Sequence, residues 1–208
     1  MDWKSAVEIA RDLAPVATAV AAASTAWIAY RGLEKWRSET IGKRKAELAE
    51  IVLADFYHAR ATLRWARSGV IFNGEIPTKA NAEEEDAKAE HRKAILRIPI
   101  NRLSKEAELF ARLASHRYRF QALFGEQGIR PFDELASIYS EIGISVQVLA
   151  EMERWEPLPG EHPANQQIME LRKKIWGGSP DDKLSKRVDL AVSAIEEFCR
   201  PALASRER

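Results

Sequence analysis

The four histidines are the residues best suited to acid–base or metal chemistry, but their spacing supports neither. They are His58, His91, His116 and His162. None belongs to an HExxH pair or to a histidine–cysteine cluster, and the chain has no GxSxG elbow and no phosphate-binding glycine loop. Asp55 and His58 share a helix face at i,i+3, which favours a surface ion pair over a metal site. The sequence therefore predicts no metal, no cofactor and no catalytic residue.

Basic side chains recur at helical spacing on two predicted helices. The two stripes are Arg60, Arg64 and Arg67, and Arg112, His116 and Arg119 with Arg117 beside them. On neighbouring helices such stripes could hold the phosphates of an RNA or a nucleotide. The alternative, which we favour, is that they form salt bridges with acidic residues. The candidates are Glu47, Glu50, Glu106, Glu108 and Glu134.

Composition points to a folded protein without a dominant charge. Apolar residues make up 46% of the 208 residues, and the 30% that are charged nearly cancel at net +1. The whole chain is therefore not steered toward nucleic acid. Cys199 is the only cysteine, which excludes an intramolecular disulfide and fits a reducing compartment. We expect this thiol to be a buried apolar residue.

The elements that must position these residues begin with an uncharged segment, Leu13–Tyr30. A helix of about 18 residues is about 27 Å long, just enough to cross a bilayer core. Trp27, Tyr30 and Trp36 lie at its end, as aromatic residues do at membrane interfaces. The sequence predicts a membrane-spanning helix, with residues 1–36 forming the anchor and its flanks.

Charges flank this segment unequally. Before it stand Lys4 and Arg11 with Asp2, Glu8 and Asp12; after it stand Arg31, Lys35, Arg37, Lys43, Arg44 and Lys45 with Glu34 and Glu39. The excess of basic residues after the segment predicts a single-pass protein of the bacterial inner membrane with its C-terminal body in the cytoplasm. The alternative is a soluble alanine-rich helix packed in a bundle, because alanine contributes little to insertion.

Small residues recur every fourth position in this segment. The rows are Ala17–Ala21, Ala19–Ala23 and Ala22–Ala26. In lipid, such rows let helices approach closely, so they predict a homo-oligomer. Thr18, Ser24 and Thr25 could then face the interior and line a pore. The alternative is that the rows reflect only an alanine-rich composition.

The remaining residues, 37–208, predict a cytoplasmic bundle of four or five helices. The first is a long helix that we expect to continue from the anchor. It has a heptad-like seam at Ala49, Val52, Phe56, Ala59, Leu63, Ala66 and Val70. A mobile acidic loop is expected over 73–93. Further helices are expected from Asn101 or Ser104 to Phe124, from Pro131 to Met152, from Ala164 to Trp176, and from Asp181 to Cys199, where Pro201 should stop the last one. No segment shows strand alternation, so the predicted fold is all-α.

Part of the chain resembles uncharacterised bacterial proteins that have an alanine-rich anchor, basic juxtamembrane sequence and a helical body. The segments SKEAELFARLASHRYRFQALFG (Ser104–Gly125) and PFDEL (Pro131–Leu135) carry the resemblance, which with the anchor covers about half of the chain. This family implies no function that can be transferred.

In organisation alone, the chain is also similar to HEPN-type helical bundles, one of which is the pore-forming accessory protein of type VI-B CRISPR systems. HEPN ribonucleases use an arginine and a histidine with four to six residues between them. Here Arg112 and His116 have three residues between them, and Arg154 and His162 have seven. Neither pair fits, which puts ribonuclease activity in doubt.

These observations predict a non-enzymatic, membrane-anchored protein that self-associates through its N-terminal helix. Its expected partners are membrane lipid, further copies of itself and an unknown cytoplasmic protein bound by the bundle. A pore-type effector is an extension of this hypothesis. The alternatives are a degenerate HEPN-like ribonuclease or nucleotide-binding bundle, and a soluble helical scaffold.

Overall fold

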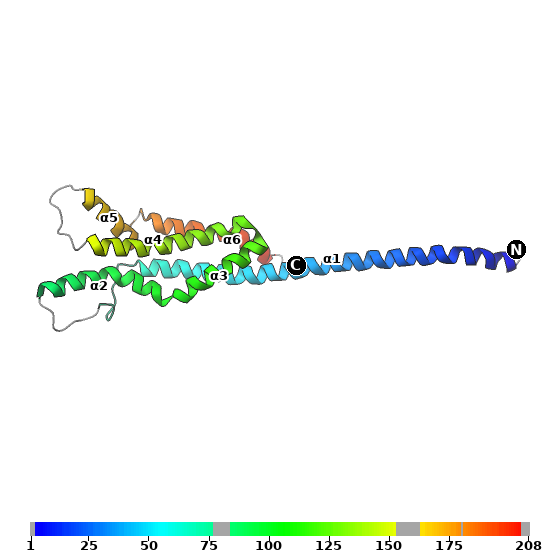
Figure 1. The fold of residues 1–208 in the computed structure, drawn as a ribbon, viewed down its shortest axis with the longest axis horizontal. Helices are drawn as coiled ribbons and strands as arrows, with labels where there is room; N and C mark the ends of the chain where they lie inside the picture. Colours follow the sequence, from blue (N-terminus) through cyan, green and yellow to red (C-terminus); the bar gives the residue numbers. More distant parts are fainter. Residues whose placement is uncertain (1–2, 77–83, 153–162, 180, 205–208) are drawn as a thin grey trace. The chain divides into compact units, whose positions relative to one another are not determined.

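Figure 1 shows the computed structural model of the chain, which describes residues 3–76, 84–152, 163–179 and 181–204, with side chains for 18–76, 90–152, 165–179 and 181–204. The regular elements are α1 (Trp3–Ala66), α2 (Glu84–Lys105), α3 (Ala107–Phe124), the short 3-10 helix η1 (Glu126–Ile129), α4 (Arg130–Met152), α5 (Pro163–Ile175) and α6 (Lys183–Ala204). No residue within these described ranges lies in a β-strand. The prediction of an all-α fold is confirmed.

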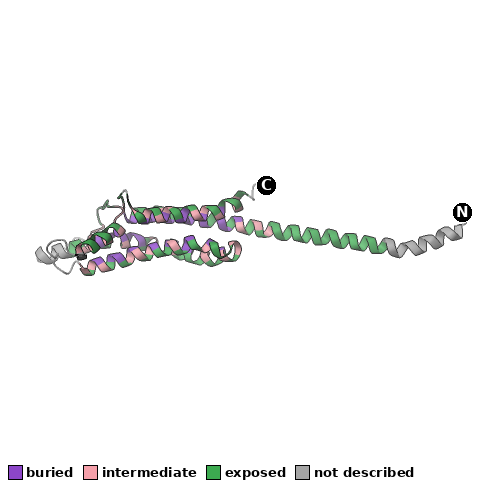
Figure 2. Cartoon of the chain, turned by 90° about the horizontal axis from the view of Figure 1, so that it is seen from above, coloured by how far each residue is buried: buried purple, intermediate pink, exposed green. Residues whose placement is uncertain are grey.

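The chain divides into two compact units, residues 1–45 and residues 46–208. The sequence had placed this boundary after residue 36. Helix α1 contributes to both units, because its residues 46–66 belong to the second. Figure 2 shows that the buried residues lie in the second unit, whereas the described side chains of the first are almost all exposed.

In the first unit, α1 is helical from Trp3 onward, and every side chain from 18 to 39 is exposed. Where side chains are described, no helix is long and apolar enough to cross a bilayer. Residues 13–17 of the predicted span lie outside those side chains. The membrane span therefore stays a prediction.

In the second unit, the predicted seam of α1 packs into the core. Its residues from Ala49 to Ala66 are at most 1% exposed. Val70 is 58% exposed because α1 ends at Ala66, so its place in the seam was predicted wrongly. Phe56 is fully buried in this core, and its ring lies edge-on to that of Phe132 of α4, with 5.0 Å between the ring centroids. Burial of such apolar side chains is the main force that holds the helices together.

Helix α2 begins within the segment predicted to be an acidic loop. The loop was expected over 73–93, but α2 starts at Glu84 and continues through Pro99 to Lys105. Glu, Ala and Lys in this segment are good helix formers, which explains why an acidic run is helical. Residues 77–83 lie outside the described residues. Glu106 interrupts the helical path between α2 and α3. Helix α3 ends at the predicted place, where Gly125 has a φ of 88°.

Helices α4 and α6 bury the faces that the sequence predicted. Leu135, Ile138, Ile142, Val146 and Leu149 of α4 are buried, as are Leu184, Val188, Ala191 and Ile195 of α6. The end of α6 differs from the prediction, because the helix runs through Pro201 to Ala204. Proline removes one backbone hydrogen bond, and so close to a helix end there are few further bonds to disrupt.

A buried arginine, Arg102 of α2, holds the chain that follows α1. Its side chain is 1% exposed and donates hydrogen bonds to the carbonyl oxygens of Trp65 and Ser68, both at 3.0 Å, and of Val70. It also donates to both carboxylate oxygens of Glu75 at 2.7 Å. The side chain therefore binds one carbonyl group of the last turn of α1 and two in the segment that follows this helix.

A second buried arginine, Arg67, holds the end of α5 in the same way. It donates to the carbonyl oxygens of Lys174 at 2.8 Å and Lys173 at 3.0 Å, and to both carboxylate oxygens of Asp182 at 2.9 and 3.0 Å. Burial alone would raise the pKa of Asp182, but hydrogen bonds from Arg67 and Ser185 outweigh it and lower this pKa. Asp182 is therefore held in its charged form.

Candidate functional site

Large apolar side chains lie exposed along the first unit. The exposed fractions are 61% for Val20, 59% for Trp27, 70% for Ile28, 62% for Tyr30, 68% for Leu33 and 65% for Trp36. Single exposed apolar residues are normal on a surface, but a continuous series is typical of an interaction site. We call the uncharged residues 18–30 the apolar segment and take it, with Leu33 and Trp36 just beyond it, as the candidate functional site.

The apolar segment has no polar face in its second half. Each residue of an α-helix is rotated by about 100° from the one before, so Trp27, Ile28 and Tyr30 point in three different directions. No charged residue lies between residues 18 and 30, so no charged face separates these directions. A helix that lies flat on a membrane or protein surface has one polar and one apolar side. Apolar residues on all sides instead favour a helix that is surrounded by its partner.

The hydroxyl groups in this segment bond to their own helix. Ser24 Oγ donates to the carbonyl oxygen of Val20, and Thr25 Oγ1 to that of Ala21, both at 2.8 Å. Together with Thr18, which is also exposed, these are the residues predicted to line a pore. Because the two hydroxyl donors are satisfied within the helix, they demand no outside acceptor.

The alanines predicted for helix packing are exposed wherever their side chains are described. These are Ala19, Ala21, Ala22, Ala23 and Ala26, whereas Ala17 lies outside the described side chains. Methyl side chains allow another helix to approach the backbone closely. The pairs Ala19–Ala23 and Ala22–Ala26 therefore supply two such places on α1.

The first basic stripe faces acidic residues of α6. Arg64 Nη2 donates to both carboxylate oxygens of Asp189 at 2.8 Å, and Arg60 Nη1 lies 3.9 Å from the same carboxylate. Arg67 is buried against Asp182. Asp189 lies on α6 and Asp182 immediately before it. Neither is among the glutamates that we expected from the sequence, because the fold brings together positions more than 100 residues apart.

The second stripe meets a buried carboxylate. Arg112 Nη2 donates to Oδ1 of Asp55 at 3.1 Å, and His116 Nε2 lies 3.8 Å from Oδ2. Asp55 is 8% exposed, and His58 lies 3.6 Å from Glu106, so the predicted Asp55–His58 surface pair is wrong. The sequence did hold a signal for Asp55, since it lies beside the seam of α1.

Two polar atoms of this cluster are buried without a hydrogen-bond partner, Asp55 Oδ2 and His116 Nδ1. A carboxylate beside an imidazole can exchange a proton with a substrate, but only where a substrate can reach it. The side chains of Asp55 and His116 are 12% and 14% exposed, and Arg112 already neutralises the carboxylate. Arg119 is exposed, and among the described residues no ion pair involves it. The arrangement therefore suits packing of α1 against α3 better than catalysis.

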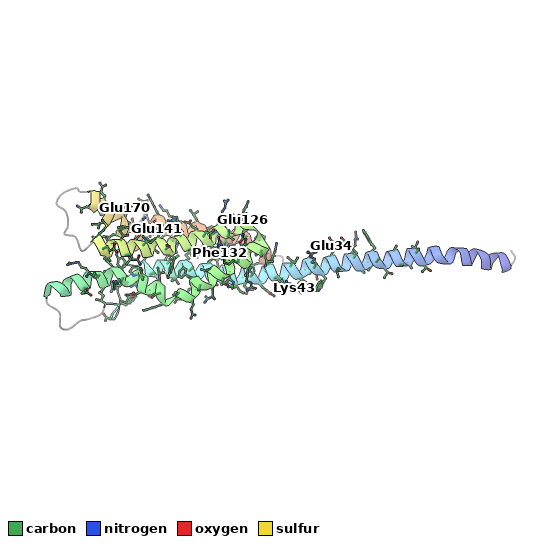
Figure 3. All side chains as sticks on the ribbon, in the orientation of Figure 1. Glu34, Lys43, Glu126, Phe132, Glu141 and Glu170 are labelled. Atoms are coloured by element: carbon green, nitrogen blue, oxygen red, sulfur yellow. The ribbon has the colours of Figure 1, made fainter. Side chains whose placement is uncertain are left out.

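A cavity of about 250 Å³ lies between α3 and α4. Its walls include Phe110 and Tyr139, whose rings are 4.6 Å apart, and Phe132, which Figure 3 labels on α4. Arg117 and Asp133 also line it and pair with each other at 2.7 Å. The cavity can hold a small apolar group, but its lining supplies no reactive side chain.

The described side chains include few that could bind a metal ion or act as a nucleophilic thiol. Among them, no three His, Cys, Asp or Glu residues gather closely enough to hold a metal ion. Cys199 is fully buried, as predicted, and burial raises the pKa of its thiol to about 12. A thiol in this state carries almost no nucleophilic thiolate near neutral pH.

No family model, curated protein or solved structure matches the chain. The resemblances to anchored bacterial proteins and to HEPN-type bundles therefore stay predictions. The candidate site rests on its own chemistry, which is an exposed apolar helix segment attached to a bundle whose arginines are largely paired.

Proposed function

We propose that the protein is a non-enzymatic, single-pass membrane protein that self-associates through its N-terminal helix and presents the second unit as a cytoplasmic interaction module. The observation that carries this proposal is the exposure of Trp27, Ile28 and Tyr30, which point in three directions around α1 just before its first described charged side chain, Arg31. Burial of each such side chain contributes about 1.5–3 kcal/mol. A bilayer surrounds a helix completely and so can bury all of them at once.

The internal hydrogen bonds of Ser24 and Thr25 support insertion of this helix. A polar group in the hydrocarbon core costs free energy unless it has a partner, and a span is tolerated when its donors are satisfied within the helix. The Thr40 hydroxyl donates to the carbonyl oxygen of Trp36 in the same way at 2.8 Å. Because their hydroxyl donors are already satisfied, Ser24 and Thr25 oppose insertion of the helix less than unpaired polar side chains would.

Self-association follows from the weak hydrophobicity of the same helix. Alanine gains little from contact with lipid, so a single alanine-rich span is a poor anchor. Close packing of several helices through Ala19–Ala23 and Ala22–Ala26 would add van der Waals contact and stabilise the inserted state. We do not extend the proposal to a pore, because the Ser24 and Thr25 hydroxyls donate within their own helix.

Carbonate extraction of membranes from cells that express the full chain tests the anchor. We expect the protein in the membrane pellet and its release by detergent. Ala22→Arg places a charge within the span, which costs about 2.5–3.5 kcal/mol, and should move protein to the soluble fraction. Leu190→Arg is the matched control, because Leu190 is apolar and 69% exposed on α6. Recovery of the unaltered protein without detergent would refute the anchor.

Light scattering of the detergent-solubilised protein tests self-association separately. We expect a particle larger than one protomer. Ala22→Leu should lower its mass, because a larger side chain keeps two helices apart. Ile28→Leu changes shape without adding volume and should leave the mass unchanged. A monomer in several mild detergents would refute self-association while leaving the anchor intact.

A further inference from the structure

Basic side chains gather directly after the apolar segment. Residues 31–45 carry six basic and two acidic side chains, a net charge of +4, whereas the whole chain carries +1. Five of the basic residues are exposed, and we call them the basic collar: Arg31, Lys35, Arg37, Lys43 and Arg44. The positive charge of the protein is therefore concentrated at one place, next to its exposed aromatic residues.

The contacts that Lys35 and Arg31 make within α1 do not prevent them from binding an external anion. Lys35 lies 3.9 Å from Glu39, and the two side chains are 81% and 57% exposed, so this pair is weak. The guanidinium of Arg31 lies over the ring of Trp27 at 5.2 Å, a contact that keeps its charge. Amphipathic side chains of this kind are favoured at the level of lipid headgroups.

The collar surrounds the helix. At about 100° per residue, Lys35 lies about 40° from Arg31, and Arg37 lies about 120° away on the other side. At about 1.5 Å per residue, Arg37 is about 9 Å beyond Arg31 and Arg44 about 20 Å beyond it. The headgroup layer on each side of a bilayer is about 5–8 Å thick. The first three residues thus fall in or next to this layer, and the last two lie further out, where salt screens their attraction.

We propose that the basic collar binds anionic lipid headgroups at the C-terminal end of the span. This inference rests on the proposed function, because it needs α1 to be inserted. The adjoining Trp27 and Tyr30 favour a bilayer surface as the partner, since these side chains belong at membrane interfaces. Guanidinium groups such as those of Arg31 and Arg37 can also bind phosphate at two points. The lipids next to the collar are therefore enriched in negative charge.

Bromine-labelled lipids test both steps on the full-length protein. It is reconstituted into equimolar phosphatidylcholine and phosphatidylglycerol, with bromine on the acyl chains of one lipid or the other. Bromine quenches nearby tryptophan fluorescence, so Trp27, which lies four residues before Arg31, reports which lipid is adjacent. One near-surface basic residue strengthens contact with an anionic surface about fivefold. We expect a preference for phosphatidylglycerol of at least about this size, and its loss in molar salt.

The control variants separate the causes. Replacement of the five collar residues by glutamine should abolish the preference while leaving quenching by brominated phosphatidylcholine intact. The matched control replaces five exposed basic residues of the second unit, Lys105, Lys173, Lys183, Lys186 and Arg200, and should keep the preference. Equal quenching by both lipids, or a preference that survives loss of the collar, would overturn this inference alone. Absence of quenching by either lipid would refute the anchor as well.

Discussion

Arg67 and Asp182 form a two-point ion pair that is almost closed to solvent, with side chains 3% and 9% exposed. Three residues earlier on α1, Arg64 forms a pair of similar length with Asp189, but those side chains are 53% and 44% exposed. Arg64 and Asp189 join α1 to α6, whereas Arg67 follows the last residue of α1 and Asp182 precedes the first residue of α6. They differ mainly in burial, which makes them a natural comparison of buried and exposed charge.

We expect Asp182→Asn to destabilise the second unit by about 3–5 kcal/mol, because it leaves a buried guanidinium without its counter-charge. Asp189→Asn should cost less than about 1 kcal/mol, since water solvates Arg64 in its place. Urea denaturation followed by circular dichroism measures both. Equal losses in the two variants would show that burial does not govern these pairs.

Glu75 should make the fold sensitive to acid. Hydrogen bonds from Arg102 and from the backbone N–H of Phe72 lower the pKa of Glu75 from 4.5 to about 2. A carboxyl group with a lowered pKa in the folded state stabilises the fold above its unfolded pKa, and this contribution is lost as the pH falls through the folded value. Glu75→Gln should therefore be less stable than the unaltered protein at pH 7, and the difference should shrink between pH 4.5 and 2.

Urea midpoints at pH 7, 4.5 and 3 measure this change. Glu126→Gln is the control, because Glu126 is exposed at the start of η1 and should show no such trend. A difference for Glu75→Gln that stays constant over this range would contradict the assigned role of the Arg102 hydrogen bonds.

Cys199 should react with iodoacetamide only after unfolding. Its thiol is fully buried, and its pKa of about 12 leaves almost no thiolate at pH 8. Labelling measured by mass spectrometry should be slow in buffer and complete in urea. A cysteine placed at the exposed position of Ser38 should be labelled at once in the same sample. Fast labelling of Cys199 in buffer would mean that α6 opens readily.

An RNA-cleavage assay tests the enzyme alternative. We expect the unaltered protein and His116→Ala to behave alike, because the side chain of His116 is 14% exposed and faces the buried Asp55. The same variant should lower stability if the imidazole serves packing. Cleavage that depends on His116 would instead favour the HEPN-like hypothesis and would contradict the non-enzymatic proposal.

Periodicity predicted which faces of the helices are buried, because burial follows from the regular geometry of a helix. The seam from Ala49 to Ala66 and the inner face of α4 from Leu135 to Leu149 are examples. Helix ends were less predictable. Val70 fits the spacing of the seam but lies beyond the end of α1, and Pro201 lies within α6. These ends depend on tertiary contacts that local spacing does not contain.

The ion-pair partners could not be predicted for the same reason. Spacing shows which basic residues share a helix face, but not which acidic residue of another helix they will meet. Arg64 and Asp189 are 125 positions apart, and Arg112 and Asp55 are 57 apart. The apolar segment, in contrast, was visible in the sequence, because an uncharged series of residues needs no tertiary partner to be recognised.

The two buried arginines have a consequence for how the second unit folds. Carbonyl groups at or just beyond the end of α1 accept hydrogen bonds from Arg102, 32 to 37 residues away, and those of the last turn of α5 accept from Arg67, 106 to 107 residues away. These hydrogen bonds form only when distant segments of the chain have come together. This coupling favours all-or-none unfolding, and a shortened chain that lacks α5 and α6 would lose the acceptors of Arg67 on Lys173 and Lys174.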